Sequence, residues 1–293
     1  MIFNIVHTTA YEYSAPAIES FTELRVRPRQ SNRQIVHHHV TEVTPRAALE
    51  EFTDYYDNMV ECLSVPYRHK MLTVTSRSTV ETLPHKDALS GLDLTVSEAV
   101  RLHWPQRREL FDFLMPSMHA PITPEIEALA KQQLRSSASF SESIKNLCSY
   151  IYEEFTYMPG VTDIRTPLMD VLRKRQGVCQ DFAHLMIALL RAAGLPARYV
   201  SGYIETDSVR GTSGLVGATA SHAWVEVYLP SGLWVGIDPT NDMLEGERHV
   251  QIGIGRDYHD VSPLRGVFKG AKRQQLSVMV TVSRTTGEMV AGK

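Results

Sequence analysis

The fold is decided by two stretches of sequence: residues 177–190, GVCQDFAHLMIALL, and residues 221–238, SHAWVEVYLPSGLWVGID. In the first stretch, apolar residues recur at the spacing of one helix face, which predicts a buried helix that begins near Cys179. This face consists of Phe182, Leu185, Met186, Leu189 and Leu190. Gly194 then favours the end of the helix as a C-terminal cap, and Pro196 prevents its continuation.

In the second stretch, apolar residues alternate with polar or aromatic residues, so that successive side chains face opposite sides of a strand. This alternation on both sides of a short turn predicts an antiparallel hairpin. If Pro-Ser-Gly at 230–232 forms the turn, Trp224 lies opposite Asp238 on the neighbouring strand. His222 is then diagonal to Asp238 on the same sheet face, about 7–8 Å away between backbones, which side chains can bridge. Because a slip of one residue would place the two on opposite faces, this prediction depends on the register.

Outside these stretches, the chain divides into three parts. Residues 1–83 carry short alternating runs separated by turn formers, which predicts a small antiparallel β domain. Residues 84–121 contain four prolines and no clear periodicity, so we expect a connector with a short helix around 108–114. Residues 122–293 combine helices with strands, and the α+β class follows. Within them, the glycine-rich segment 205–218 is expected to be a mobile loop between two strands.

The composition excludes several classes of protein. Hydrophobic residues make up 43% of the chain and charged residues 22%, as in soluble globular proteins. A net charge of -3 gives no bulk attraction for phosphate, so we expect no nucleic acid partner. We expect no membrane span and no signal peptide, because apolar runs are short and the first residues lack a basic region. Three widely spaced cysteines favour reduced thiols and a cytoplasmic location.

Cys179 is the candidate nucleophile, because the apolar face begins at Phe182 and leaves Cys179 at an exposed helix tip. A thiol at a helix N-terminus lies near unpaired N–H groups and the positive end of the dipole, and both favour the reactive thiolate. His222 is the candidate base and Asp238 the residue that orients it, which completes the usual set for nucleophilic catalysis. Cys148 lies on a predicted apolar helix face and is interpreted as a buried hydrophobe, as is Cys62.

Six segments also carry a family resemblance. They are residues 24–30 (LRVRPRQ), 177–184 (GVCQDFAH), 190–203 (LRAAGLPARYVSGY), 221–227 (SHAWVEV), 234–240 (WVGIDPT) and 255–258 (GRDY). Together they resemble the transglutaminase-like superfamily, in its bacterial branch with an N-terminal β domain. The resemblance implies a papain-like arrangement in which the helix carrying Cys179 packs against an antiparallel sheet that bears His222 and Asp238.

The chemistry that the resemblance implies is attack on a carboxamide of a peptide or protein, through a thioester that water or an amine resolves. No cofactor is implied. Animal transglutaminases have tryptophan after the cysteine, whereas this chain has Gln180, and no acidic loop resembles a calcium-binding EF-hand. Calcium-activated crosslinking is therefore not carried over, and many relatives of this kind resemble peptidases or amidases.

Three further residues have two interpretations each. Tyr157 is either a donor to the oxyanion or a packed aromatic residue at a helix end. Trp224 either lines the cleft or belongs to the core. Asp181 either supports the site from behind or complements the helix dipole in the first turn.

Two rival readings of the main site remain open. Cys179, His222 and Asp238 could bind zinc, although no paired-ligand spacing accompanies them. The chain could also be a binding module with a vestigial triad. The sequence leaves the natural substrate and the oligomeric state undetermined.

Overall fold

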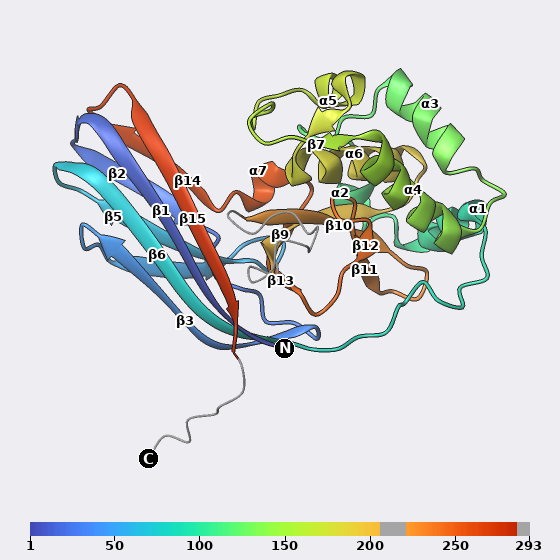
Figure 1. The fold of residues 1–293 in the computed structure, drawn as a ribbon, viewed down its shortest axis with the longest axis horizontal. Helices are drawn as coiled ribbons and strands as arrows, with labels where there is room; N and C mark the ends of the chain where they lie inside the picture. The colour runs from blue at the N-terminus through green and yellow to red at the C-terminus, as the bar shows by residue number, and fades with distance from the viewer. Residues whose placement is uncertain (206–220, 286–293) are drawn as a thin grey trace, which may run out of the picture.

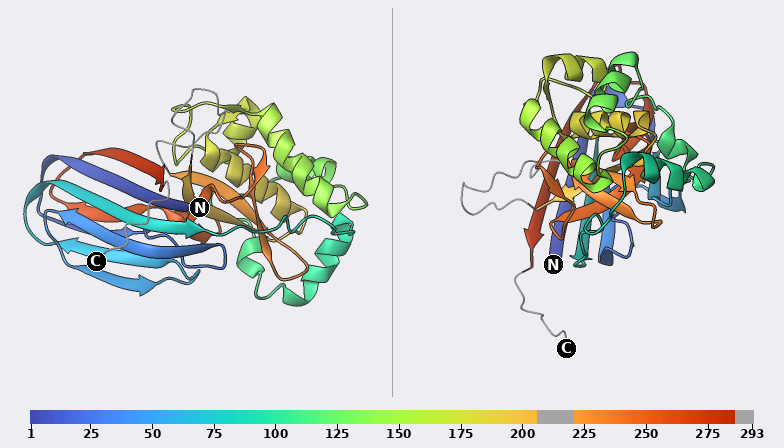
Figure 2. Two further views of the ribbon diagram at one scale, coloured as in Figure 1. Left: turned by 60° about the horizontal axis from the view of Figure 1, so that its bottom comes forward. Right: turned by 90° about the vertical axis from the view of Figure 1, so that its right-hand side faces the viewer.

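The computed structural model describes residues 1–205 and 221–285 and contains two lobes that lie side by side (Figures 1 and 2). One lobe is built of strands, and the other combines a five-stranded sheet with helices. The predicted α+β class is confirmed. From residue 206 onward, the loop predicted at 205–218 lies outside the described residues.

The β lobe consists of two four-stranded antiparallel sheets. Its strands are β1 (Ile2–Ala17), β2 (Glu19–Leu24), β3 (Gln34–Thr44), β4 (Leu49–Thr53), β5 (Met59–Val65), β6 (His69–Thr82), β14 (Leu264–Lys269) and β15 (Gln274–Arg284). The strand orders are β15-β1-β6-β3 and β14-β2-β5-β4. Alternating residues of these strands, among them Leu24, Leu63 and Leu72, point inward and form the core of the sandwich.

Two strands of this lobe come from the C-terminal end of the chain. The sequence predicts residues 122–293 as one catalytic domain, but β14 pairs with β2 and β15 pairs with β1. In Figure 1 the red strand β15 runs beside the blue strand β1. The structure differs here because β1 and β2 would otherwise be sheet edges, whose free N–H and C=O groups the two returning strands satisfy.

The connector is more ordered than its prolines indicate. It contains α1 (Val96–His103), the 3₁₀ turn η1 (Trp104–Gln106) and α2 (Phe111–Leu114), the last of which falls within the helix expected at 108–114. A capping box between Thr95 and Glu98 begins α1. Val96 and Ala99 of this helix are buried in the core of the second lobe, so the connector packs against that lobe.

The second lobe is a sheet of order β12-β11-β10-β9-β13 with helices on one face (Figure 1). Its elements are α3 (Pro124–Gln133), α4 (Phe140–Glu154), β7 (Thr156–Tyr157), α5 (Leu168–Lys174), β8 (Gln176–Gly177), α6 (Cys179–Ala192), β9 (Ala197–Ile204), β10 (His222–Tyr228), β11 (Trp234–Asp238), β12 (Met243–Leu244), β13 (His249–Gly255) and α7 (Tyr258–Val261). Helix α6 packs on β9 and β10, and α3, α4 and α5 cover it. It is therefore buried around most of its circumference. Among the described residues, no helix combines the length and apolarity needed to cross a membrane.

The hairpin of β10 and β11 has the predicted register. Tyr228 pairs with Trp234 and Val225 with Ile237, and the turn between the strands includes Gly232 at a positive φ of 87°. Continuing this register places Asp238 opposite Trp224, as predicted, so that His222 and Asp238 share one face of the sheet.

The two lobes share a hydrophobic core and several buried hydrogen bonds. The shared cluster is made of Phe3, Ile5, Val80 and Val280 from the β lobe and Tyr203, Val250 and Ile252 from the sheet of the second lobe. The Asn58 side chain also accepts from the N–H of Ile254 and donates to its carbonyl, at 2.8 Å each. The β lobe therefore supports the sheet that carries the candidate site.

Candidate active site

Cys179 is the first residue of α6, directly after the N-cap residue Val178. The first N–H groups of a helix have no acceptor within it, so those of Cys179 and Gln180 can face an anion beside the thiol. The sequence predicts an exposed helix tip, but this is wrong, since Cys179 is only 9% exposed. Other side chains close over the helix start, and two of them, Tyr157 and Tyr199, lie near enough to interact with the charge of the thiolate.

Asp181 fixes the turn that leads into α6. Its Oδ2 accepts from the N–H of Val178 at 2.8 Å and from the hydroxyl of Thr162 at 2.7 Å. A Cβ on Gly177 would come within 2.8 Å of the Asp181 side chain, so glycine makes room for this contact. Burial raises the pKa of Asp181, while the two hydrogen bonds lower it. These contacts are with the turn behind the thiol, and Asp181 also lies in the first turn of α6, so its position is compatible with both interpretations.

Tyr157 lies beside the thiol. Strand β7 pairs with β8 so that Tyr157 is next to Gly177, and the N–H of Met158 donates to the Gly177 carbonyl at 2.8 Å. Burial, followed by the charge of Cys179, raises the pKa of Tyr157 to about 12. Its hydroxyl is therefore protonated at neutral pH and is available as a hydrogen-bond donor.

His222 and Asp238 form a buried ion pair. The distance between His222 Nε2 and Asp238 Oδ2 is 2.7 Å, and both side chains are inaccessible to solvent. Burial alone would lower the pKa of His222, but the charge and hydrogen bond of Asp238 outweigh it and raise this pKa to about 10. Burial opposes ionisation of Asp238 too, yet the charge of His222 holds the pKa of that carboxyl well below its ordinary value.

A set of further donors surrounds the Asp238 carboxylate. Oδ1 accepts from the N–H of Thr240 at 2.9 Å, and Oδ2 accepts from Asn241 Nδ2 at 2.7 Å. His249 Nε2 approaches Oδ2 at 3.3 Å, while its Nδ1 accepts from the N–H of Gly246 at 3.2 Å. These donors all favour the ionised carboxylate, which in turn holds the His222 ring in one orientation.

The second nitrogen of His222 is left for the thiol. Nδ1 is buried and has no hydrogen-bond partner among the described residues. Cys179 is nevertheless a near neighbour, because its side chain adds to the rise in the pKa of His222, after the larger contribution of Asp238. The structure thus brings Cys179, His222 and Asp238 together in the order that the sequence predicts.

Trp224 does not line a cleft, contrary to one of its two interpretations. Its side chain is fully buried, with the ring centre 6.0 Å from that of His222 and 5.1 Å from that of His249. A Cβ on Gly202 would meet the Trp224 indole at 2.4 Å, so glycine is needed below the ring. Trp224 therefore belongs to the core and packs beside His222.

Sequence reasoning missed three residues of the site: Tyr199, Asn241 and His249. Asn241 follows the Asp-Pro-Thr segment at 238–240, so its proximity to Asp238 could have been inferred from a tight turn. Tyr199 and His249 come from β9 and β13, and no local pattern signals their positions. Only the strand order of the sheet brings them to the site.

Sequence reasoning interprets the other two cysteines as buried hydrophobes, and the structure shows Cys148 buried but Cys62 half-buried. Cys148 is buried in α4, and its thiol donates to the backbone carbonyl of Asp238 at 3.4 Å. Burial strongly raises the pKa of Cys148 and, less strongly, that of Cys62. Neither thiol has a histidine contact that would favour its thiolate among the described residues.

The potential metal ligands that the structure brings together are not the three residues of the zinc alternative. Ligand atoms of His222, Asp238 and His249 lie within 4.8 Å of one another, and Cys179 is not in this group. Because Gly246 donates to Nδ1 of His249, the ring proton resides on Nε2 and points at Asp238. A metal would have to replace that proton and the His222 contact, so the three side chains fit a hydrogen-bonded set.

Comparisons with known proteins identify the family of the chain. The model of the transglutaminase-like superfamily matches residues 127–239, and the model of the bacterial transglutaminase-like N-terminal region matches residues 3–81. An uncharacterized protein of Mycobacterium tuberculosis is 37% identical over 294 residues, which cover 98% of this chain and 94% of the relative. The chain therefore belongs to the transglutaminase-like superfamily.

Two further similar proteins match this chain over very different shares of its length. Protein-glutamine gamma-glutamyltransferase of Pseudomonas aeruginosa is 32% identical over 152 residues, 47% of this chain but 22% of that protein. The crystal structure of a Cytophaga hutchinsonii protein, described as a "putative cysteine protease", has a TM-score of 0.74 at 23% identity and covers 98% of this chain and 92% of its own. The latter likeness confirms the fold across both lobes.

Proposed function

We propose that the protein is a thiol enzyme that cleaves or transfers the acyl group of a peptide or protein carboxamide. The observation that carries the proposal is the buried His222–Asp238 pair at 2.7 Å, whose free Nδ1 lies next to a thiol at a helix N-terminus. A structural cysteine would not require a histidine whose carboxylate partner is held by three further donors. The family supports thiol-dependent amide chemistry in general.

In the first half of the reaction, Cys179 attacks the amide carbon. His222 holds the thiol proton as imidazolium, and the sulfur forms a bond to carbon while the carbonyl π electrons move to oxygen. When the tetrahedral intermediate collapses, the carbon–nitrogen bond breaks and His222 passes its proton to the leaving ammonia or amine. A thioester on Cys179 remains. Asp238 stabilises the imidazolium and fixes the ring throughout.

The negative oxygen would be stabilised by donors near the start of α6. The N–H group of Cys179 has no intrahelical acceptor, and we assign the second donor to the Tyr157 hydroxyl. This assignment is supported by the position of Tyr157 beside the thiol and by its pKa of about 12, which keeps the hydroxyl proton in place at neutral pH.

In the second half, water or a primary amine attacks the thioester, with His222 accepting the proton of the nucleophile. Resolution by an amine is the reaction named for the Pseudomonas aeruginosa relative, whose matched region spans about half of this chain. Resolution by water would give a peptidase or amidase. Both outcomes use the same acyl-enzyme.

The test is to trap that acyl-enzyme. The protein is incubated with a library of glutamine-containing peptides, quenched in acid, and digested for mass spectrometry. The expected result is an acyl adduct on Cys179 that is lost in Cys179→Ala and that hydroxylamine removes, as it removes thioesters. Cys62→Ala serves as the matched control and should retain the adduct. Absence of any adduct, amide product or amine incorporation across the library would reject the proposal.

A further inference from the structure

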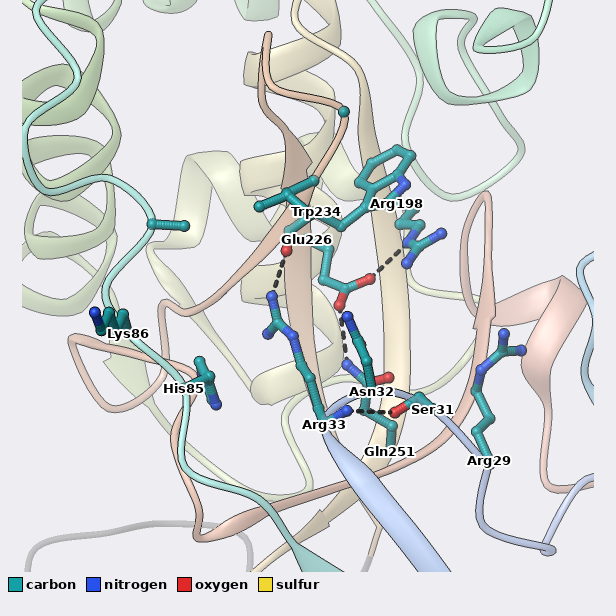
Figure 3. A pocket seen from close by; sticks show the side chains of 13 residues that line it. Arg29, Ser31, Asn32, Arg33, His85, Lys86, Arg198, Glu226, Trp234 and Gln251 are labelled. Carbon is teal, nitrogen blue, oxygen red and sulfur yellow. Dashed lines mark hydrogen bonds and ion pairs between the residues drawn. The ribbon is translucent and has the colours of Figure 1, made fainter.

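A cavity lies between the two lobes (Figure 3), and none of the triad residues lines it. Its volume is about 550 Å³, and its walls come from residues 29–33 of the β lobe, residues 85–88 of the connector and the sheet of the second lobe. Two of its wall residues, Glu226 and Trp234, lie four positions from His222 and Asp238 on the same strands. Four residues of strand span roughly 13 Å, so this cavity is a separate site.

Cationic side chains predominate in the wall. Arg29, Arg33, Lys86 and Arg198 line the cavity, whereas Glu226 is the acidic residue that lines it. A second carboxylate, Glu245, lies behind the wall and is paired with Arg33. The four cations thus face two nearby carboxylates, which leaves positive charge in a half-enclosed space.

The two carboxylates are already occupied by hydrogen bonds. Glu226 accepts from Arg198 Nε at 2.5 Å and from Gln251 Nε2 at 2.9 Å. Gln251 Nε2 also donates to Glu245 at 2.9 Å. Both acids are therefore already engaged, whereas Arg29 has hydrogen bonds to neutral acceptors and Lys86 has no hydrogen bond to a carboxylate among the described residues.

Arg198 presents donors in a fixed plane. Its guanidinium lies over the Trp234 ring, 4.1 Å from the ring centre, and its Nε is held by Glu226. The two terminal nitrogens form no hydrogen bond among the described residues. In Figure 3 they lie on the same side of the cavity as the guanidinium of Arg29. A stacked and anchored guanidinium loses little conformational freedom when it binds an anion.

Arg29 is held in the same space by neutral acceptors. Its Nη1 donates to the carbonyls of Tyr56 and Asp57 and to the side chain of Asn58, at 3.1, 2.9 and 2.6 Å. Burial, and next the charge of Arg198, lower the pKa of Arg29, and they outweigh the charges of Glu226, Asp57 and Asp54, which raise it. Two guanidinium groups therefore repel each other here, and an anion between them would relieve that repulsion.

We propose that this cavity binds a small anion, with a carboxylate or phosphate group held between Arg29 and Arg198. Planar guanidinium groups bind both kinds of oxyanion through paired hydrogen bonds. The volume suits a molecule of metabolite size, for which protein sites usually measure about 300–1,000 Å³. Lys86, which is exposed at the rim, adds charge that draws the anion in.

The test is a titration of the full-length protein by calorimetry with inorganic phosphate and, separately, with succinate, at constant ionic strength set by chloride. Saturable binding of either probe, with a stoichiometry of one, is expected. Phosphate alone would assign the site to phosphate compounds, and succinate alone to carboxylates. Arg29→Gln and Arg198→Lys are each expected to weaken binding by roughly tenfold, since each removes charge-assisted hydrogen bonds. Arg198→Lys keeps a positive charge beside Glu226, so it tests whether binding needs the planar guanidinium group with its paired N–H donors.

Three comparisons make the outcome decisive. Lys131→Gln, an exposed change on α3, should leave binding unaltered. Cys179→Ala should also bind normally, because the anion site does not depend on the proposed reaction. Circular dichroism and the melting temperature identify variants that fail to fold. If the arginine variants fail to fold, Lys86→Glu at the exposed rim is tested instead, and it should bind the anion more weakly. The proposal is overturned if neither probe binds, or if folded Arg29 and Arg198 variants bind as the wild type does.

Discussion

Replacing Asp238 by asparagine is expected to slow the alkylation of Cys179 at neutral pH by about tenfold or more. The substitution removes the negative charge that holds the proton on His222. It also places an amide where the carboxylate accepts from Thr240 N–H at Oδ1 and from Asn241 at Oδ2. An asparagine has a single acceptor atom, so one of these donors must face the amide NH₂ group.

The magnitude follows from the protonation of His222. The pKa of His222 is about 10 in the folded protein, so the ring is almost fully protonated at pH 7.5. Without the charge of Asp238, burial pulls this pKa back toward its ordinary value of 6.5 or below it. At a pKa of 6.5 only about one ring in ten is protonated at pH 7.5, and the thiolate loses its cationic partner in the same proportion.

The assay is a time course with iodoacetamide, followed by digestion and quantification of each cysteine peptide by mass spectrometry. Cys62 serves as the internal reference, because it lies on β5 in the β lobe, burial raises the pKa of its thiol, and Asp238 does not contribute to that pKa. Asp93→Asn is the matched control, a change of the same kind at an exposed position. Histidine NMR should show the fall in the pKa of His222 directly.

The reasoning would be refuted by a folded Asp238→Asn protein that labels at Cys179 within twofold of the wild-type rate. An equal loss in Asp93→Asn would refute it as well, because the effect would then be unspecific.

Three other predictions follow from the same contacts. The unfolding free energy should fall by up to a few kcal/mol as the pH rises from 6.5 to about 10, because the unfolded chain releases the His222 proton near pH 6.5 and the folded protein keeps it until about pH 10. Urea titrations at a series of pH values should show this decline, and the His222→Gln variant should largely lack it. His249→Phe should slow Cys179 alkylation about threefold, less than Asp238→Asn, because Asp238 keeps its three other donors. Gly202→Ala should destabilise the protein by about 1–3 kcal/mol in urea, because its Cβ would meet the Val250 carbonyl at 2.2 Å.

Each of these has a contrary result. A decline with pH that is equally steep in His222→Gln would assign it to other groups. A labelling rate in His249→Phe as low as that of Asp238→Asn would mean that His249 does more than hold the carboxylate. Gly246→Ala is the control for Gly202→Ala, since nothing lies within 4 Å of its added Cβ, and equal losses in both would contradict the packing argument.

The parts of the fold that were predictable are those with a local pattern. Helix α6 follows from its apolar spacing and from Pro196, and the β10–β11 register follows from the Gly232 turn, because only one register puts the apolar residues on the covered face. That register alone places His222 near Asp238, and the start of α6 places the thiol at free N–H groups. Most of the candidate site is therefore encoded in about 60 residues, 177–238.

The rest depends on pairings that leave no local trace. The run at residues 275–284 predicts a strand but not that its partner is β1, since every sheet edge offers the same backbone groups. His249 reaches Asp238 because β13 is added beside β9, a choice made by the whole sheet. The alternation of β10 also shows which way Trp224 points, but it cannot show that the β lobe covers that face, so the sequence alone could not choose between the cleft and core interpretations of Trp224.

The return of β14 and β15 to the β lobe makes that lobe discontinuous in the gene. A fragment ending near residue 83 would lack one strand from each of its sheets, and a chain stopped after residue 263 would leave one edge of β1 and one edge of β2 unpaired. During synthesis, the sheet that carries His222 and Asp238 is complete before the sandwich that supports it receives its last two strands. The two lobes are thus separate in space, but a single cut in the chain does not divide them into independent folding units. A truncated or recombined chain has to keep β14 and β15 together with the rest of the β lobe.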